Sequence, residues 1–212
     1  MWSRRQFGAA GMVGLSALGL ETQAIAAEAP EEGFEFLRLK TPVPRMATQR
    51  VEVVKFFRYG CPFCAQFEPM VEKWRQQLPA DVSFQYIPVS FHSTAHQQLH
   101  LTLRQMGQVG RLHMAVYDGV HREGQHFELL KDISEWMHGR GVDPIAFEAA
   151  WHSREVAKAM DQANAIVNAY GVTSVPQFGV AGLYRTSPTM AGGSNARVLE
   201  VVTYLLEQVR HS

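Results

Sequence analysis

The sequence predicts an α/β fold in which an all-helical block interrupts a smaller, strand-containing frame. Three observations support this prediction. Residues 51–57 form a short run of β-branched and aromatic residues, and a helical pattern and a second strand pattern follow it. Residues 92–163 carry only helical patterns. Strand patterns return after Gly171, before a last amphipathic helix.

The composition of the 212 residues is that of a globular protein. Hydrophobic residues make up 46% and aromatic residues 10%, which excludes wholesale disorder. The 20 basic side chains balance the 20 acidic ones, so the chain lacks the basic excess typical of nucleic-acid binding, and no nucleic-acid partner is expected. Its two cysteines, Cys61 and Cys64, are too few for a disulfide-stapled scaffold or a four-thiolate zinc site.

The first 26 residues have the pattern of a cleaved export signal. Arg4 and Arg5 precede an apolar run at 9–20, and the Ala-Ile-Ala sequence at 24–26 fits a small-x-small cleavage site. The apolar run is too short for a membrane anchor, which needs about 20 residues. The sequence Ser-Arg-Arg-Gln-Phe at 3–7 favours the twin-arginine route, with general secretion as the alternative. Export would place the cysteines in a compartment where disulfides persist.

Residues 27–91 are expected to hold a short edge strand, two longer strands and a helix. The edge strand is indicated near residues 34–39, and a central strand at 51–57. Residues 82–89 alternate as another strand, with Pro88 near its end. The order strand, helix, strand predicts a right-handed crossover between parallel strands.

The helix between these strands should begin at the cysteines. Its apolar face follows helical spacing and comprises Phe67, Val71, Trp74 and Leu78. Pro69 lies inside this pattern and should kink the helix, because proline lacks an N–H and clashes with the preceding turn. Pro79 should end it.

The rest of the chain is expected to be helical up to Gly171 and mixed afterwards. Asp143 and Pro144 look like a helix start, with Asp as the cap and Pro in the first turn. Helices are indicated near residues 99–110, 112–120, 133–137, 144–151 and 156–170, strands at 175–180 and 183–186, and a last helix at 198–209.

The sequence Cys61-Pro62-Phe63-Cys64 places two thiols at the start of a predicted helix. There, free backbone N–H groups and the helix dipole stabilise a thiolate on the first cysteine. We therefore expect Cys61 to be an exposed nucleophile with a low pKa, and Cys64 to be the buried resolving thiol. Stronger stabilisation of the Cys61 thiolate would make the disulfide a stronger oxidant of other proteins.

Other interpretations of the cysteine pair remain. A lone C-x-x-C is half of a zinc site, and His92, His96 and His100 are spaced four residues apart as candidate ligands. A simpler interpretation makes these histidines a polar helix face. A purely structural disulfide would close too small a loop to add much stability. Export and the strand-to-helix position favour redox chemistry, so no metal is expected.

Three stretches resemble the DsbA-type thiol:disulfide oxidoreductases. They are residues 53–68 (VVKFFRYGCPFCAQFE), 141–151 (GVDPIAFEAAW) and 171–176 (GVTSVP). The resemblance covers nearly the whole mature chain. It implies a thioredoxin fold formed by residues 27–91 and 164–212, with residues 92–163 as an inserted helical domain.

The resemblance also assigns a role to the loop before the strand at 175–180. It implies that Pro176 is cis and lies beside the cysteines, where the Val175 backbone would pair with a substrate segment. The residues alone leave open a trans proline that opens an edge strand.

The active-site region departs from the family pattern at three positions. Phe63 stands where many members have a histidine between the cysteines, next to Pro62. Lys55 stands where the best-known members have a buried acid beneath the cysteines. Pro62, Phe63 and Lys55 are thus expected to tune the thiolate, unless Lys55 merely extends to solvent. Pro69 resembles the helix proline of thioredoxins.

The resemblance implies a periplasmic enzyme that donates its Cys61–Cys64 disulfide to reduced exported proteins during oxidative folding. A DsbB-type membrane oxidase would restore the disulfide, and the chain would be a monomer without a cofactor. One alternative is a reductase or isomerase on the same scaffold, although residues 27–49 are too short for a dimerisation domain. Another is a non-catalytic peptide-binding module, which would not need both cysteines.

Overall fold

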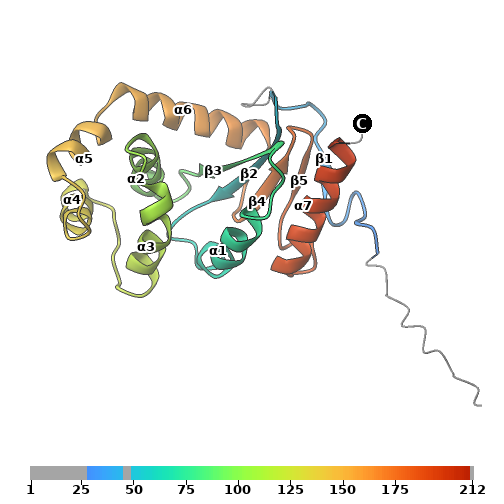
Figure 1. The fold of residues 1–212 in the computed structure, drawn as a ribbon, viewed down its shortest axis with the longest axis horizontal. Helices are drawn as coiled ribbons and strands as arrows, with labels where there is room; N and C mark the ends of the chain where they lie inside the picture. The colour runs from blue at the N-terminus through green and yellow to red at the C-terminus, as the bar shows by residue number, and fades with distance from the viewer. Residues whose placement is uncertain (1–27, 45–48, 211–212) are drawn as a thin grey trace, which may run out of the picture.

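A five-stranded mixed sheet forms the frame of one half of the molecule (Figure 1). The computed structural model describes residues 28–44 and 49–210, so the predicted export signal lies outside the described residues. The strand order is β1-β5-β4-β2-β3. The strands are β1 (Leu37–Arg38), β2 (Val51–Phe57), β3 (Val82–Pro88), β4 (Gln177–Val180) and β5 (Tyr184–Thr186).

The strand β2 lies inside the sheet, and six of its seven residues are buried. It pairs in parallel with β3, as the strand–helix–strand order predicted, and antiparallel with β4. Its β-branched and aromatic side chains fit a strand that is covered on both faces. The expected edge strand near residues 34–39 forms, but only two of its residues pair with β5.

The helix α1 (Pro62–Arg75) begins at the cysteines and continues through Pro69. Together with α7 (Asn195–Arg210) it packs on one face of the sheet, where Phe67, Phe178 and Val202 share one apolar core. The helix ends at Arg75, earlier than the sequence indicated. Leu78 precedes a proline and is disfavoured in helical conformation, and the chain unwinds into short turns before it.

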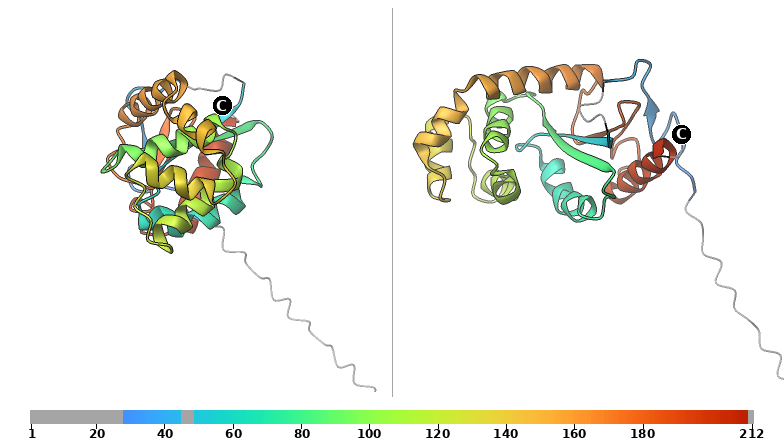
Figure 2. Two further views of the ribbon diagram at one scale, coloured as in Figure 1. Left: turned by 90° about the vertical axis from the view of Figure 1, so that its left-hand side faces the viewer. Right: turned by 45° about the horizontal axis from the view of Figure 1, so that its top comes forward.

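The predicted helical block forms the other half of the molecule (Figures 1 and 2). Its helices are α2 (Thr94–Gln105), α3 (Val109–His121), α4 (Leu130–His138), α5 (Pro144–Trp151) and α6 (Arg154–Ala169). Leu99, Val116 and Phe147 belong to an apolar core that continues into the other half, where it includes Phe57 of β2 and Cys64 of α1. The start of α5 matches the prediction, because Asp143 accepts a 2.7 Å hydrogen bond from the Ala146 N–H and Pro144 occupies the first turn.

The long helix α6 connects this helical half to the sheet (Figure 2). Its last turns carry Ala163 and Val167, which pack against Val54 of β2 and Ile87 of β3. The domain boundary proposed between residues 163 and 164 therefore falls within one continuous helix. None of the helices within the described ranges is long and apolar enough to cross a membrane.

Candidate active site

The two cysteines lie at the first turn of α1. Cys61 is the N-cap residue, with an extended backbone, and its Sγ accepts a 3.4 Å hydrogen bond from the Cys64 N–H. Pro62 occupies the first helical position, where its fixed φ suits a helix and its missing N–H leaves no donor unpaired. Both cysteines are free thiols in this structure. The first turn thus directs backbone N–H groups at the Cys61 sulfur, as the sequence predicted.

The nucleophilic thiol is more covered than the sequence predicted. Cys64 is 0% exposed, but Cys61 is only 7% exposed and is not the exposed nucleophile that the sequence predicted. The reason is a loop distant in sequence: the Cys61 Sγ lies 3.6 Å from the Val175 carbonyl oxygen, which covers it. A substrate therefore has to reach Cys61 beside this loop.

The two thiols differ in acidity because their surroundings differ. The pKa of Cys61 is lowered to about 6, first by a hydrogen bond from the Cys64 thiol. The N–H groups of Cys64 and Phe63 and the charge of Arg58 add to this effect, while burial opposes it. Burial and the neighbouring Cys61 raise the pKa of Cys64. At neutral pH the pair therefore holds one thiolate and one thiol.

The loop before β4 lies beside the cysteines. The Val175-Pro176 peptide bond is cis, as the resemblance implied. Phe63, Val175 and Pro176 line a groove of about 480 Å³ together with Pro188. The Phe63 side chain is 69% exposed, so its ring is free to contact a ligand in the groove. The predicted substrate-contact residues are thus brought together around Cys61.

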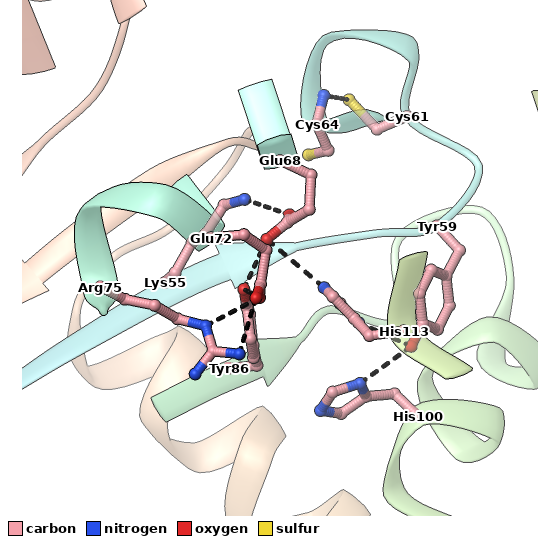
Figure 3. A network of polar contacts seen from close by, with 10 residues as sticks. All are labelled: Lys55, Tyr59, Cys61, Cys64, Glu68, Glu72, Arg75, Tyr86, His100 and His113. Carbon is pink, nitrogen blue, oxygen red and sulfur yellow. Dashed lines mark hydrogen bonds and ion pairs between the residues drawn. The ribbon is translucent and has the colours of Figure 1, made fainter. Parts of the chain in front are cut away.

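Beneath the cysteines, Lys55 forms a buried ion pair with Glu68. Lys55 comes from β2 and Glu68 from α1; both side chains are 0% exposed, and the Lys55 ammonium donates to the Glu68 carboxylate (Figure 3). The alternative in which Lys55 extends to solvent is therefore wrong. Sequence reasoning did not assign a role to Glu68. Its position on the helix could have predicted that Glu68 is buried, because it shares one face of α1 with Cys64, Phe67 and Val71.

Tyr86 of β3 and His113 of the helical half extend this pair (Figure 3). The Tyr86 hydroxyl donates a 2.5 Å bond to Oε1 of Glu68, and His113 Nε2 lies 3.5 Å from the same oxygen, at ion-pair distance without hydrogen-bond alignment. His113 Nδ1 in turn lies 2.9 Å from the Tyr59 hydroxyl. Burial by itself would raise the pKa of the Glu68 carboxyl, but Lys55 and His113 outweigh it and lower this pKa to about 2. Glu68 is therefore a carboxylate.

The three histidines at spacing four do not form the polar helix face that the sequence indicated. His92 precedes α2, whose N-cap is Ser93, while His96 and His100 are buried. His96 contacts the Gly60 backbone, and His100 Nδ1 lies 3.1 Å from the Tyr59 hydroxyl. The prediction failed because these side chains find polar partners in the segment just before Cys61. Burial lowers the pKa of both rings, which favours their neutral forms.

Comparison with known proteins places the chain in a family. Residues 52–200 match the family model of the DSBA-like thioredoxin domain. The chain belongs to the DsbA family. It is 37% identical over 198 residues to the thiol:disulfide interchange protein DsbA of Azotobacter vinelandii, covering 92% of each chain. It is 36% identical over 180 residues to DsbA of Pseudomonas aeruginosa, covering 84% of this chain and 85% of that one.

Solved DsbA structures show the same architecture. The crystal structure of Pseudomonas aeruginosa DsbA superposes with a TM-score of 0.83 at 35% identity, covering 86% of this chain and 95% of that one. These relatives confirm the predicted thioredoxin fold with inserted helices. They also confirm that the chain is a thiol:disulfide oxidoreductase. This finding favours the hypothesis of oxidative folding over that of a non-catalytic binding module.

Proposed function

We propose that Cys61 and Cys64 are the redox pair, and that the protein donates their disulfide to reduced exported proteins in the periplasm. One observation carries this proposal: at the N-terminus of α1, the pKa of Cys61 is lowered to about 6 while that of Cys64 is raised. A stabilised Cys61 thiolate favours the reduced pair over the disulfide, so the disulfide is readily passed on.

The reaction has two exchange steps. A substrate thiolate attacks the Cys61 Sγ of the oxidised pair, forming a mixed disulfide while the Cys64 sulfur leaves and takes up a proton. The second substrate thiolate then attacks the substrate sulfur of this mixed disulfide and releases Cys61 as a thiolate. The substrate loses two electrons and gains a disulfide, and the Cys61–Cys64 pair gains two electrons.

The groove beside Cys61 would hold an extended substrate segment. The backbone of Val175, next to Pro176, would pair with that segment as an added strand, and the exposed ring of Phe63 would contact its apolar side chains. The Val175 carbonyl already lies 3.6 Å from the Cys61 Sγ, so a paired segment would bring its cysteine to the nucleophile.

The finer assignments rest on the family and on the local chemistry. Pro62, Phe63 and Lys55 would tune the thiol pair, Lys55 through its positive charge near Cys64. A DsbB-type membrane oxidase would restore the disulfide. We further propose cleavage of residues 1–26, a thioredoxin-like domain of residues 27–91 and 164–212 with the insertion at 92–163, and a monomeric enzyme without a bound cofactor.

A redox titration of the mature protein in glutathione buffers tests the direction of electron flow. Thioredoxin has a reduction potential of about −270 mV, and we expect the midpoint potential of this protein to lie well above that value. A midpoint near the thioredoxin value would instead support a reductase.

A second experiment tests the nucleophile. The Cys61→Ser variant should lose the oxidation of a reduced, unfolded protein substrate. Retained activity would contradict the role of Cys61 and point to a binding module.

A further inference from the structure

We infer that His96 and His121, on two helices of the insertion, are positioning residues that hold the Tyr59–Gly60 backbone and thereby fix Cys61 at the N-terminus of α1. This segment joins the end of β2 to the nucleophile. The inference rests on the proposed function only in taking Cys61 as the reacting thiol. The inserted helices would then shape the chemistry as well as the surface around it.

Two side chains of the insertion hold the Tyr59–Gly60 backbone, and Arg58 of the frame adds a 3.3 Å hydrogen bond to the Gly60 carbonyl. The Tyr59 carbonyl accepts a 2.7 Å hydrogen bond from His121 Nε2, and the Gly60 N–H donates a 3.1 Å bond to His96 Nδ1. Backbone polar groups that are covered by protein need such partners. The one local backbone bond at this turn joins the Cys61 N–H to the Arg58 carbonyl at 3.1 Å.

The contacts of His96 define its proton position. The Gly60 N–H can only donate, so His96 Nδ1 has no proton and accepts. The His126 carbonyl can only accept, so His96 Nε2, which lies 2.8 Å from it, carries the proton. His96 is therefore a neutral ring held at both nitrogens, in agreement with its burial. A ring fixed in this way gives the Gly60 N–H an acceptor of fixed direction.

The His96 ring also packs directly on the Gly60 backbone. A Cβ atom added at Gly60 would lie 3.0 Å from Cε1 and 3.2 Å from Nδ1 of His96, so the approach depends on glycine. The preceding side chain is held as well, because the Tyr59 hydroxyl lies between His100 and His113. The segment before Cys61 thus contacts α2 and α3 through both its backbone and its side chain.

This arrangement matters for Cys61 because an N-cap residue depends on the chain that leads into it. The Cys61 Sγ receives the Cys64 N–H at 3.4 Å only while its backbone stays extended and the turn stays in place. If the Tyr59–Gly60 backbone loses its partners, the turn relaxes and the sulfur moves away from the helix N–H groups. The thiolate then loses hydrogen bonds that favour its charged form.

The test measures the pKa of Cys61 in variants of the mature protein by following thiolate absorbance against pH. In His96→Leu and His121→Leu, we expect this pKa to rise by about half a unit or more, which lowers the thiolate-to-thiol ratio about threefold. His96→Asn retains an acceptor for the Gly60 N–H, and His121→Gln retains a donor for the Tyr59 carbonyl. In both variants, the pKa of Cys61 should stay close to its value in the unaltered protein. The exposed His138→Leu is the control and should not change the pKa.

The outcomes separate positioning from mere support of the fold. If the leucine variants unfold more easily but keep the pKa of Cys61, the inference is wrong. If they do not fold, nitrogen NMR of the unaltered protein decides, because a proton on Nδ1 of His96 would contradict the bond from Gly60. The pKa can be measured whether the enzyme oxidises or reduces its substrates, so failure here is distinct from failure of the proposed function.

Discussion

Cys61 and Cys64 are the same residue type three positions apart, yet their acidities move in opposite directions. Cys61 collects hydrogen-bond donors at the start of α1, and its pKa is lowered from 9.0 to about 6. Relative to an ordinary cysteine, this shift favours the thiolate by about 4 kcal/mol. Cys64 is one helical turn further in and fully buried, so its charged form is disfavoured. Environment, rather than residue type, divides the roles of attacking and resolving thiol.

The thiol of Cys64 is the largest contributor to the acidity of Cys61, and this can be tested by removing it. In Cys64→Ala, we expect the pKa of Cys61 to rise by about one unit or more, because a hydrogen bond to a charged group contributes about 1.5–3 kcal/mol. The pKa of Cys61 is measured by following its rate of alkylation against pH. Cys64→Ser keeps a hydroxyl donor and should show a smaller rise; equal inflections in all three proteins would contradict this account.

The buried Lys55–Glu68 pair predicts a strong effect on stability when one partner is removed. Glu68→Gln would leave the Lys55 ammonium buried without its counter-charge, and we expect a loss of about 3–5 kcal/mol in the free energy of unfolding. Urea unfolding measures this loss. The double variant Lys55→Met, Glu68→Leu is the matched control, because an apolar pair of similar volume should recover much of the stability. A Glu68→Gln variant as stable as the unaltered protein would show that the pair is not buried as described.

The same carboxyl predicts how stability depends on pH. The pKa of Glu68 is about 2 in the folded protein and 4.5 in the unfolded chain, so the unfolded state binds the proton more readily. Its stabilisation is therefore complete above about pH 4.5 and is lost as the pH falls toward about 2. Unfolding free energies measured across this window should fall more steeply for the unaltered protein than for Glu68→Gln. Parallel curves would contradict the prediction.

At the scale of the element, the start of α1 carries both the chemistry and the recognition. Cys61 is its N-cap, Pro62 its first residue and Phe63 its exposed second residue. A single helical turn thus presents a thiolate and an aromatic ring on the same side as the Val175-Pro176 loop. Phe63 acts on the thiolate through its backbone N–H, whereas its side chain makes no hydrogen bond to the Cys61 sulfur, so the two functions can be separated.

Replacing Phe63 tests this separation. Burial of a Phe side chain contributes about 1.5–3 kcal/mol. In Phe63→Ser, we therefore expect kcat/KM for a reduced protein substrate to fall by about tenfold or more, because the substrate loses its apolar contact with the aromatic ring. The reaction with dithiothreitol, which is too small to fill the groove, should keep its rate. An equal loss with both reductants would assign Phe63 to the chemistry instead of to recognition.

At the scale of the whole molecule, side-chain contacts join the helical insertion to the sheet, in addition to the two segments where the chain passes between them. The helix α6 packs on the insertion at one end and on the sheet at the other (Figure 2). Tyr59 and Glu68 of the frame meet His100 and His113 of the insertion in a buried polar network. Disrupting either half would leave buried polar groups of the other half without partners, which is costly.

We therefore expect the two halves to unfold in one cooperative transition. Trp74 lies on α1 beside the sheet, and Trp136 lies on α4 in the insertion. Variants of the mature protein that keep Trp74 or Trp136 as the single tryptophan, with Trp151 also replaced, should give the same denaturation midpoint by fluorescence as by circular dichroism. Separate midpoints for Trp74 and Trp136 would show that the halves unfold independently.

Short-range patterns in the sequence located most elements and the position of the chemistry. They missed some boundaries: α1 ends earlier than indicated, and Val109, expected at the end of one helix, begins α3. Apolar periodicity located β2, β3 and the helices, Asp143-Pro144 marked the start of α5, and the C-x-x-C spacing placed two unequal thiols at a helix start. These features depend on hydrogen bonds and side-chain spacing within a few residues. They can therefore be predicted from residues that are neighbours in the sequence.

The surroundings of the site depend on residues that only folding brings together. Glu68 meets Lys55 across 13 positions, and His113 meets Tyr59 across 54. The carbonyl that covers Cys61 comes from Val175, 114 positions away. No local periodicity records whether a charged or polar side chain at a buried position has a partner, because that partner lies on another element. Tertiary packing thus decided that Lys55 is buried, that the histidines face inward, and how far Cys61 is covered.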